Sequence, residues 1–189
     1  MAKQSTRRTF LLQAAGTSAT AITLPYFVPN RAFGANDRIQ TGHIGVRNQG
    51  GSNLRAFINH AVAVCDVDTD VLAKAVKVVE QSGRACEAFG DYRRLLDRKD
   101  IDAVVISTPD HWHALMTIDA CRAGKDVYCE KPLSLTIAEG RQMVNAARQG
   151  QRIVQTGSQQ RSDKGFRLAC ELVRAGRVGK LQQIGRAHV

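Results

Sequence analysis

Apolar residues follow two different spacings along this chain, and the two spacings alternate. Continuous apolar runs are typical of strands buried on both faces, whereas apolar residues that recur every three or four positions are typical of a helix with one buried face. The pattern predicts strands at 38–46, 61–65, 86–89, 103–106, 126–129, 152–155 and 181–189. It predicts helices at 50–59, 70–81, 91–99, 110–123, 136–148 and 163–175, with a capping box formed by Thr136 and Glu139.

This order of elements predicts an α/β fold. Strands that alternate with helices of about 10–15 residues are joined by crossover connections, so they form a doubly wound parallel sheet, the Rossmann fold, with helices on both faces. Such sheets bind their ligands outside the carboxyl ends of the strands. The loops that follow the predicted strands are therefore where functional residues are expected.

The loop after the first predicted strand carries part of a dinucleotide-binding motif, the sequence GVRNQG at residues 45–50. In the full motif G-x-G-x-x-G, the first glycine (Gly45) allows a tight turn and the third (Gly50) allows close packing of helix on strand. Arg47 replaces the second glycine, beside which the pyrophosphate passes. Two roles stay open for Arg47: its cation can turn toward a phosphate, or its side chain can crowd the turn and weaken binding.

An acidic residue follows the second predicted strand. Asp66 lies 21 residues after Gly45, where a carboxylate can accept hydrogen bonds from the adenosine ribose of a dinucleotide. The same charge would repel a 2′-phosphate, so Asp66 favours NAD over NADP. The alternative is a solvated loop acid beside Asp68.

The loop at residues 107–113, STPDHWH, also follows a strongly apolar strand. His111 and His113 invite a metal-binding interpretation, but they are two residues apart with no Cys or Glu in ligand register. We therefore expect no metal here. The favoured interpretation is a helix N-cap at Asp110 with ring packing against a cofactor.

The tripeptide Glu130-Lys131-Pro132 follows the strand predicted at 126–129. A lysine held near the crevice by a rigid proline can polarise a substrate oxygen or assist proton transfer during hydride transfer. The alternative is an exposed Lys131 paired with Glu130.

Residues 107–134, STPDHWHALMTIDACRAGKDVYCEKPLS, resemble the signature stretch of the Gfo/Idh/MocA oxidoreductases, and QTGSQQR at 155–161 resembles their exported members. The resemblance extends over residues 38–189 and implies an NAD(P)-binding Rossmann domain with Lys131 in a substrate-facing catalytic role. The cofactor contacts then expected are Gly45, Arg47, Gly50, Asp66, Thr108, Pro109, His113 and Glu130. The chain departs from the family at Asp110, where an Asn is usual, and at Arg47.

Family members carry a second α/β domain that binds the substrate and mediates oligomerisation, with a catalytic D-x-x-x-H motif. After Lys131 the only Asp is Asp163, four residues before Arg167, so that motif is missing. We expect an export signal at 1–34, the Rossmann domain at 35–160, and at 161–189 a connecting helix and first strand of a second domain that is largely missing. Two functions stay open. One is hydride transfer to or from a sugar or polyol, and the other is a catalytically inactive cofactor-binding fragment, for which a homo-oligomer is doubtful.

The net charge of the chain is interpreted differently once the N-terminal residues are counted separately. The 189-residue chain has a formal net charge of +10, but residues 1–34 hold four basic residues and no acidic one. Arg7 and Arg8, followed by an uncharged stretch, resemble a Tat export signal and predict a periplasmic location. The stretch 9–24 is too short and polar to span a membrane, which takes about 20 apolar residues. The remaining 23 basic and 17 acidic residues, with 5% aromatics, predict no nucleic-acid partner.

The five cysteines, at 65, 86, 121, 129 and 170, are odd in number and form no C-x-x-C pair. Most lie in apolar runs, so we expect small buried hydrophobic side chains rather than disulfides or metal ligands.

Overall fold

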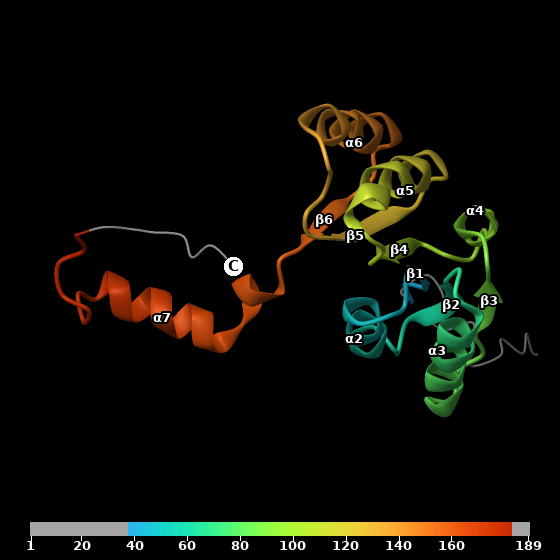
Figure 1. The fold of residues 1–189 in the computed structure, drawn as a ribbon, viewed down its shortest axis with the longest axis horizontal. Helices are drawn as coiled ribbons and strands as arrows, with labels where there is room; N and C mark the ends of the chain where they lie inside the picture. The colour runs from blue at the N-terminus through green and yellow to red at the C-terminus, as the bar shows by residue number, and fades with distance from the viewer. Residues whose placement is uncertain (1–37, 183–189) are drawn as a thin grey trace, which may run out of the picture. The chain divides into compact units, whose positions relative to one another are not determined.

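The structure is a computed structural model that describes residues 38–182. Its centre is a six-stranded, fully parallel sheet in the order β3-β2-β1-β4-β5-β6 (Figure 1). The strands are β1 (Thr41–Ile44), β2 (Ala61–Cys65), β3 (Glu87–Phe89), β4 (Ala103–Ile106), β5 (Asp126–Glu130) and β6 (Val154–Gly157). The helices are α2 (Gln49–Ala56), α3 (Thr69–Gln81), α4 (Tyr92–Leu96), α5 (Asp110–Arg122), α6 (Ile137–Gly150), the 3-10 helix η3 (Gln159–Ser162) and α7 (Lys164–Arg174).

Helices cover both faces of the sheet, as the element order predicts. On one face α2 and α3 pack against β1 and β2 through Leu54 and Val79. On the other face α4, α5 and α6 contribute Leu95, Met116 and Ala146 to a larger core with β1, β4 and β5. The doubly wound Rossmann fold is therefore confirmed, and the chain reverses its direction of winding between β1 and β4.

Most element boundaries differ from the prediction by one or more residues. The last strand, β6, begins at Val154 rather than at 152. The Arg152 N–H donates to the Ala147 carbonyl of α6, whereas the Ile153 carbonyl already accepts from the Val127 N–H of β5. The Arg152 guanidinium donates to the Gly124 carbonyl, and the Ile153 N–H donates to Asp126. The 3-10 helix η3 was not predicted.

The caps of the helices are partly as expected. The capping box of Thr136 and Glu139 at the start of α6 is confirmed. The predicted N-cap at Asp110 is wrong: Pro109 occupies the cap position of α5, without a side-chain cap bond, and Asp110 lies in the first turn. The Asp110 carboxylate lies near the positive end of the helix dipole, where its negative charge is stabilised, instead of capping an N–H group.

Most of the cysteines are core residues, as predicted. Cys65, Cys121 and Cys129 are buried, and none of the five forms a disulfide. Burial raises the pKa of the Cys65 thiol to about 12 and that of Cys129 to about 11, so both stay protonated and unreactive. Cys170 is the exception, because it is exposed on α7, a helix without buried residues.

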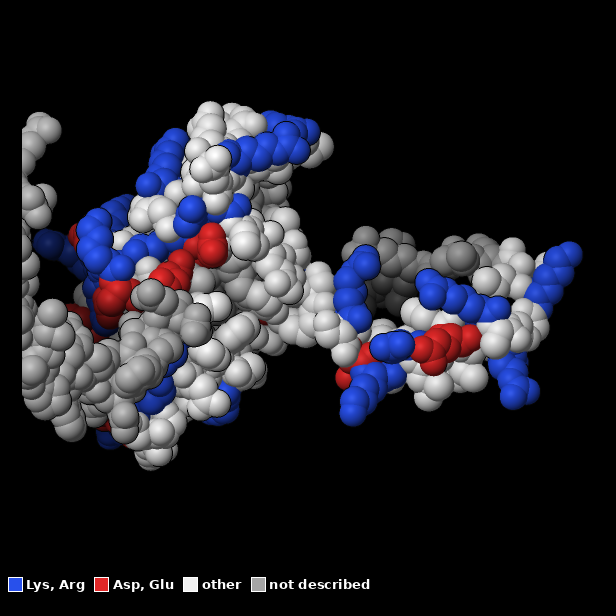
Figure 2. Space-filling view, turned by 180° about the vertical axis from the view of Figure 1, so that it is seen from behind, with Lys and Arg blue, Asp and Glu red and all other residues white. Residues whose placement is uncertain are grey.

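The predicted export signal at 1–34 lies outside the described residues, as does most of the strand predicted at 181–189. Within residues 38–182, no helix is long and apolar enough to cross a membrane. On the face shown in Figure 2, Lys and Arg side chains are interspersed with Asp, Glu and uncharged residues rather than gathered in one continuous stripe.

His43 makes the stability of this fold depend on pH. Its side chain is 1% exposed in β1 and contacts the Thr41 hydroxyl through Nε2, 3.1 Å away. Burial lowers the pKa of His43 from 6.5 to about 4. Between these values the unfolded chain binds a proton that the folded protein does not, so this contribution to stability is complete above pH 6.5 and is lost as the pH falls toward 4.

We expect this one group to reduce the free energy of unfolding by about 3 kcal/mol between neutral pH and pH 4. Urea unfolding at both pH values should show that reduction in the wild type and lack it in His43→Leu. An equal reduction in the two proteins would contradict the assignment.

Candidate cofactor site

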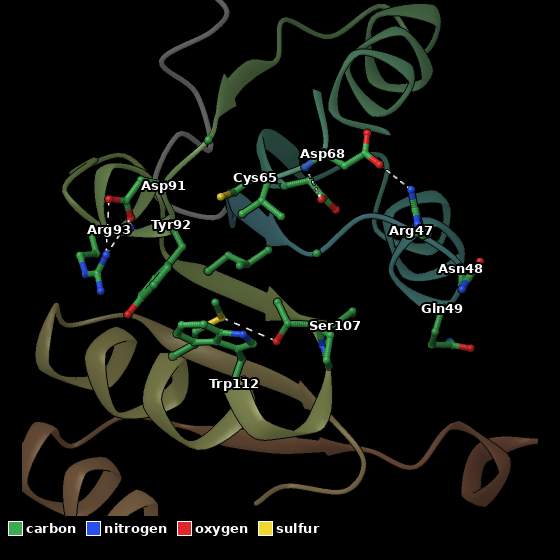
Figure 3. Close-up of a pocket in the computed structure, with 18 residues that line it drawn as sticks. Arg47, Asn48, Gln49, Cys65, Asp68, Asp91, Tyr92, Arg93, Ser107 and Trp112 are labelled. Carbon is green, nitrogen blue, oxygen red and sulfur yellow. Dashed lines mark hydrogen bonds and ion pairs between the residues drawn. The ribbon is translucent and has the colours of Figure 1, made fainter. Parts of the chain in front are cut away.

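A cavity of about 920 Å³ opens at the carboxyl ends of the central strands (Figure 3). Four segments line it: the turn after β1, the end of β2, the start of α4, and the loop after β4 with the first turns of α5. It therefore lies at the point where the strand order reverses, which is where doubly wound sheets bind ligands. Five of the predicted site residues line it, namely Gly45, Arg47, Asp66, Thr108 and Pro109.

The turn after β1 has room only for glycine at two positions. Gly45 has φ +77°, and a Cβ there would lie 2.9 Å from the Ser107 carbonyl oxygen. A Cβ on Gly50 would lie 2.0 Å from the carbonyl oxygen of Gly45. The first glycine thus makes the tight turn and the third brings α2 against β1, as the motif predicts.

Arg47 replaces the second glycine without blocking the turn. Its guanidinium pairs with Asp68 at 2.5 Å, and both side chains are largely exposed at the rim of the cavity (Figure 3). The unusual backbone falls on the next residue, Asn48, with φ 43°, a residue type that tolerates positive φ better than most. Sequence reasoning missed Asn48, although Asn within a glycine-rich turn is the signal that could have found it.

Asp66 is fixed by two backbone donors. Its carboxylate accepts one hydrogen bond from the N–H of Val46 and one from the N–H of Asp68, each 3.0 Å long. Asp68 caps α3, and its hydrogen bond from the Val71 N–H is the main reason why its pKa is lowered. Two carboxylates therefore stand at the end of β2 in fixed positions.

Residues of the loop after β4 and of the first turn of α5 differ in where they lie: some line the cavity and others are buried. Trp112 lines the cavity beside Thr108 and Pro109 and is 39% exposed. His113, the next residue, is 1% exposed and does not line the cavity. Its Nε2 lies 2.7 Å from the Thr108 carbonyl oxygen and its Nδ1 2.6 Å from that of Pro132. Direct contact of His113 with a cofactor stays a prediction, and in the structure both of its ring nitrogens face protein carbonyl oxygens.

The Glu-Lys-Pro segment lies at the end of β5. Lys131 is exposed and its amine makes no ion pair with Glu130 in the described part of the chain. Glu130 is 4% exposed and accepts hydrogen bonds from Asn53 on α2, at 2.9 Å, and from Gln159 on η3. Its carboxylate is thus occupied by protein donors. Asn53 and Gln159 were missed by sequence reasoning, because no local pattern marks them.

The residues present fit a dinucleotide. The N–H groups of Gly50, Gly51 and Ser52 donate to carbonyl oxygens of the preceding turn. What suits a pyrophosphate is the positive end of the α2 dipole, beside the room that the close approach of Gly45 and Gly50 leaves. The carboxylate of Asp66 suits ribose hydroxyl groups. Across residues 38–182, no three His, Cys, Asp or Glu side chains are grouped so that they could hold a metal ion.

A family model for oxidoreductases with an NAD-binding Rossmann fold matches residues 33–158. The chain belongs to the Gfo/Idh/MocA oxidoreductase family. Inositol 2-dehydrogenase of Salmonella typhimurium is 30% identical over 156 residues, which are 79% of this chain and 46% of that protein. A glycosyl hydrolase family 109 protein of Shewanella pealeana is 31% identical over 93% of this chain and 39% of its own length. The chain spans less than half the length of these relatives.

Solved structures of the family have the same fold. Myo-inositol 2-dehydrogenase from Lactobacillus plantarum superposes with a TM-score of 0.67 at 31% identity, over 76% of this chain and 43% of that one. Scyllo-inositol dehydrogenase from Lactobacillus casei, with bound NAD(H) and scyllo-inositol, superposes with a TM-score of 0.64 at 30% identity, over 75% and 42%. The Gfo/Idh/MocA assignment is thus supported by sequence and by fold.

Proposed function

We propose that this domain binds NAD in the cavity at the carboxyl ends of the strands and serves hydride transfer to or from a sugar or polyol of the inositol class. The observation that carries the proposal is the cavity itself, which is lined by Gly45 of the close-packed glycine turn and by Asp66, whose carboxylate is held by the N–H of the neighbouring Val46. Relatives named inositol dehydrogenases, one with NAD(H) bound, support the substrate class.

The charges at the end of β2 favour NAD over NADP. The carboxylates of Asp66 and Asp68 stand where the adenosine ribose is expected, and a 2′-phosphate there would meet two negative charges. Arg47 is already paired with Asp68, so its cation is less available to a phosphate. We expect weaker binding of NADPH than of NADH.

Lys131 supplies the acid–base chemistry in this proposal. When bound, NAD would supply hydride transfer from a hydroxyl-bearing carbon of the substrate and, in its reduced form, the reverse transfer to a carbonyl carbon. The Lys131 amine, exposed at the end of β5, hydrogen-bonds the substrate oxygen and exchanges a proton with it. The loop after β4 lines the cavity, and β4 is the neighbour of β5 in the sheet.

Trp112 provides a direct test. It is the only tryptophan of the chain and lines the cavity, so bound NADH should quench its emission by energy transfer. Titration of the full chain with NADH and NADPH, followed by turnover assays with NAD and a panel of inositols and sugars, tests each part. Absence of both quenching and a thermal shift would refute the proposal. Binding without turnover would favour the alternative of an inactive cofactor-binding fragment.

A glycoside is a second candidate substrate. The Shewanella pealeana relative, named as a glycosyl hydrolase, aligns with 93% of this chain. Nitrophenyl glycosides added to the NAD-loaded protein distinguish the two cases, because cleavage releases nitrophenol without net formation of NADH.

We also infer export by the Tat route to the periplasm. The support is the sequence alone, Arg7 and Arg8 before an uncharged stretch. The double substitution Arg7→Lys with Arg8→Lys should retain the protein in the cytoplasm on cell fractionation, while Arg31→Lys should leave its distribution unchanged. Equal distribution of the wild type and the double variant would contradict export by this route.

A further inference from the structure

Two buried side chains each bridge the same two loops. Asn53, 5% exposed on α2, donates from its amide nitrogen to the Ser107 hydroxyl at 3.0 Å and to the Glu130 carboxylate at 2.9 Å. His113, 1% exposed on α5, contacts the Thr108 carbonyl oxygen at 2.7 Å and the Pro132 carbonyl oxygen at 2.6 Å. One partner of each bridge is thus in the loop after β4, and the other is the last residue of β5, Glu130, or the loop residue Pro132.

The bridges hold the residues on both sides of Lys131. Asn53 holds Glu130, the residue before it, and His113 holds Pro132, the residue after it. Gln159 donates a further hydrogen bond to the Glu130 carboxylate. The main chain at Lys131 is therefore fixed from two directions, while its side chain stays exposed.

The His113 ring is the donor in these contacts. A carbonyl oxygen can only accept a hydrogen bond, so a ring nitrogen that carries a proton donates to the carbonyl oxygen that it faces.

A purely structural core would favour apolar residues at these positions. Burying an amide and an imidazole ring costs free energy that hydrogen bonds only partly offset. The loop after β4 lines the cavity through Ser107, Thr108 and Pro109, and the loop after β5 follows the neighbouring strand of the sheet. A dinucleotide lies across the point where the strand order reverses, so an adenosine half at Asp66 leaves the nicotinamide half to the loops after β4 and β5.

We propose that His113 and Asn53 are positioning residues, which clamp the loop of Lys131 to the loop after β4 and so shape the nicotinamide half of the site. This inference rests on the proposed binding of NAD. Binding of the adenosine half should not depend on either bridge, because Asp66 is held by the backbone N–H groups of Val46 and Asp68.

Affinities for NADH and for ADP-ribose, which lacks the nicotinamide, test the clamp. In the full chain, His113→Leu and Asn53→Leu should each weaken NADH binding about tenfold while ADP-ribose binding stays within about twofold of the wild type. His43→Leu is the matched control, since His43 is equally buried at 1% exposure but bridges no loops. It should change stability and leave the ratio of the two affinities as in the wild type.

The wild type could bind NADH while the His113 and Asn53 variants keep its ratio of NADH affinity to ADP-ribose affinity. That result would overturn the clamp alone. Failure of the wild type to bind NADH would overturn the proposed function and the positioning role with it. If the variants do not fold, the wild type itself decides by nitrogen-15 NMR of the histidine rings. A ring proton of His113 that is protected from exchange with solvent supports the clamp, and a ring whose protons exchange freely overturns it.

Discussion

The Gly50→Ala substitution should both destabilise the protein and weaken NADH binding. A methyl group on Gly50 would lie 2.0 Å from the carbonyl oxygen and 2.8 Å from the carbonyl carbon of Gly45. Neither is the end of a flexible side chain, so α2 must move away from β1 as a unit. We expect the free energy of unfolding to fall by about 3 kcal/mol, the upper range for overpacking. NADH affinity should fall at least tenfold, because the positive end of the α2 dipole moves with the helix.

Gly51→Ala is the matched control, one residue further along the same helix. A Cβ there would lie 3.3 Å from the Val46 carbonyl oxygen and 3.6 Å from the Arg55 guanidinium, contacts that small adjustments can accommodate. Alanine also favours a helix by about 1 kcal/mol over glycine. Urea unfolding and quenching of Trp112 by NADH measure both effects. Equal behaviour of the two variants would contradict the close packing of α2 on β1.

In protein that turns over a polyol with NAD, the Lys131→Met substitution should lower turnover at least about 100-fold. That is the usual contribution of a positioned acid–base group. Methionine keeps the length and apolar stem of the side chain but removes the amine that exchanges the proton. Lys131 is exposed and does not line the cavity that holds the dinucleotide in our proposal. The dissociation constant for NADH should therefore change less than about twofold.

Lys99→Met provides the control for a change of charge alone. Lys99 is also exposed, but it precedes β4 and lies at the opposite, amino-terminal edge of the sheet. It should leave turnover and NADH affinity unchanged. Lys131→Arg tests the acid–base role further, because arginine keeps the positive charge but does not release a proton. Turnover retained in Lys131→Met would exclude Lys131 as the catalytic residue.

Much of the site was predictable because the carboxyl ends of parallel strands all lie on the same side of the sheet. Once the alternating pattern identified the strands, the residues that follow them had to meet there, whatever their distance along the chain. Gly45, Asp66 and Thr108 were found in this way, and all three line the cavity. The glycine positions were predictable for a second reason, since positive φ and close backbone contact leave few other residue types.

The different positions of the neighbouring residues Trp112 and His113 could not be predicted in this way. Both lie in the first turn of α5 after the same strand, yet Trp112 faces the cavity and His113 is buried between two loops. Successive helical residues point about 100° apart, so the direction of each depends on how the helix is rotated against the sheet. That rotation is decided by the packing of α5 on β4 and β5, which the predicted contact of His113 with a cofactor does not take into account.

By itself, the sequence determined the alternation of strands and helices, the edge at which the site lies, and the glycines of the first turn, because each depends on local periodicity or local backbone geometry. Only the tertiary structure decided that Arg47 pairs with Asp68 and that Asn53 reaches Glu130, 77 residues away. The physical reason is that hydrogen bonds and ion pairs of this kind join residues that become neighbours only when the sheet assembles. Asn53 and His113 are ordinary polar residues of their helices until the loops after β4 and β5 close around them.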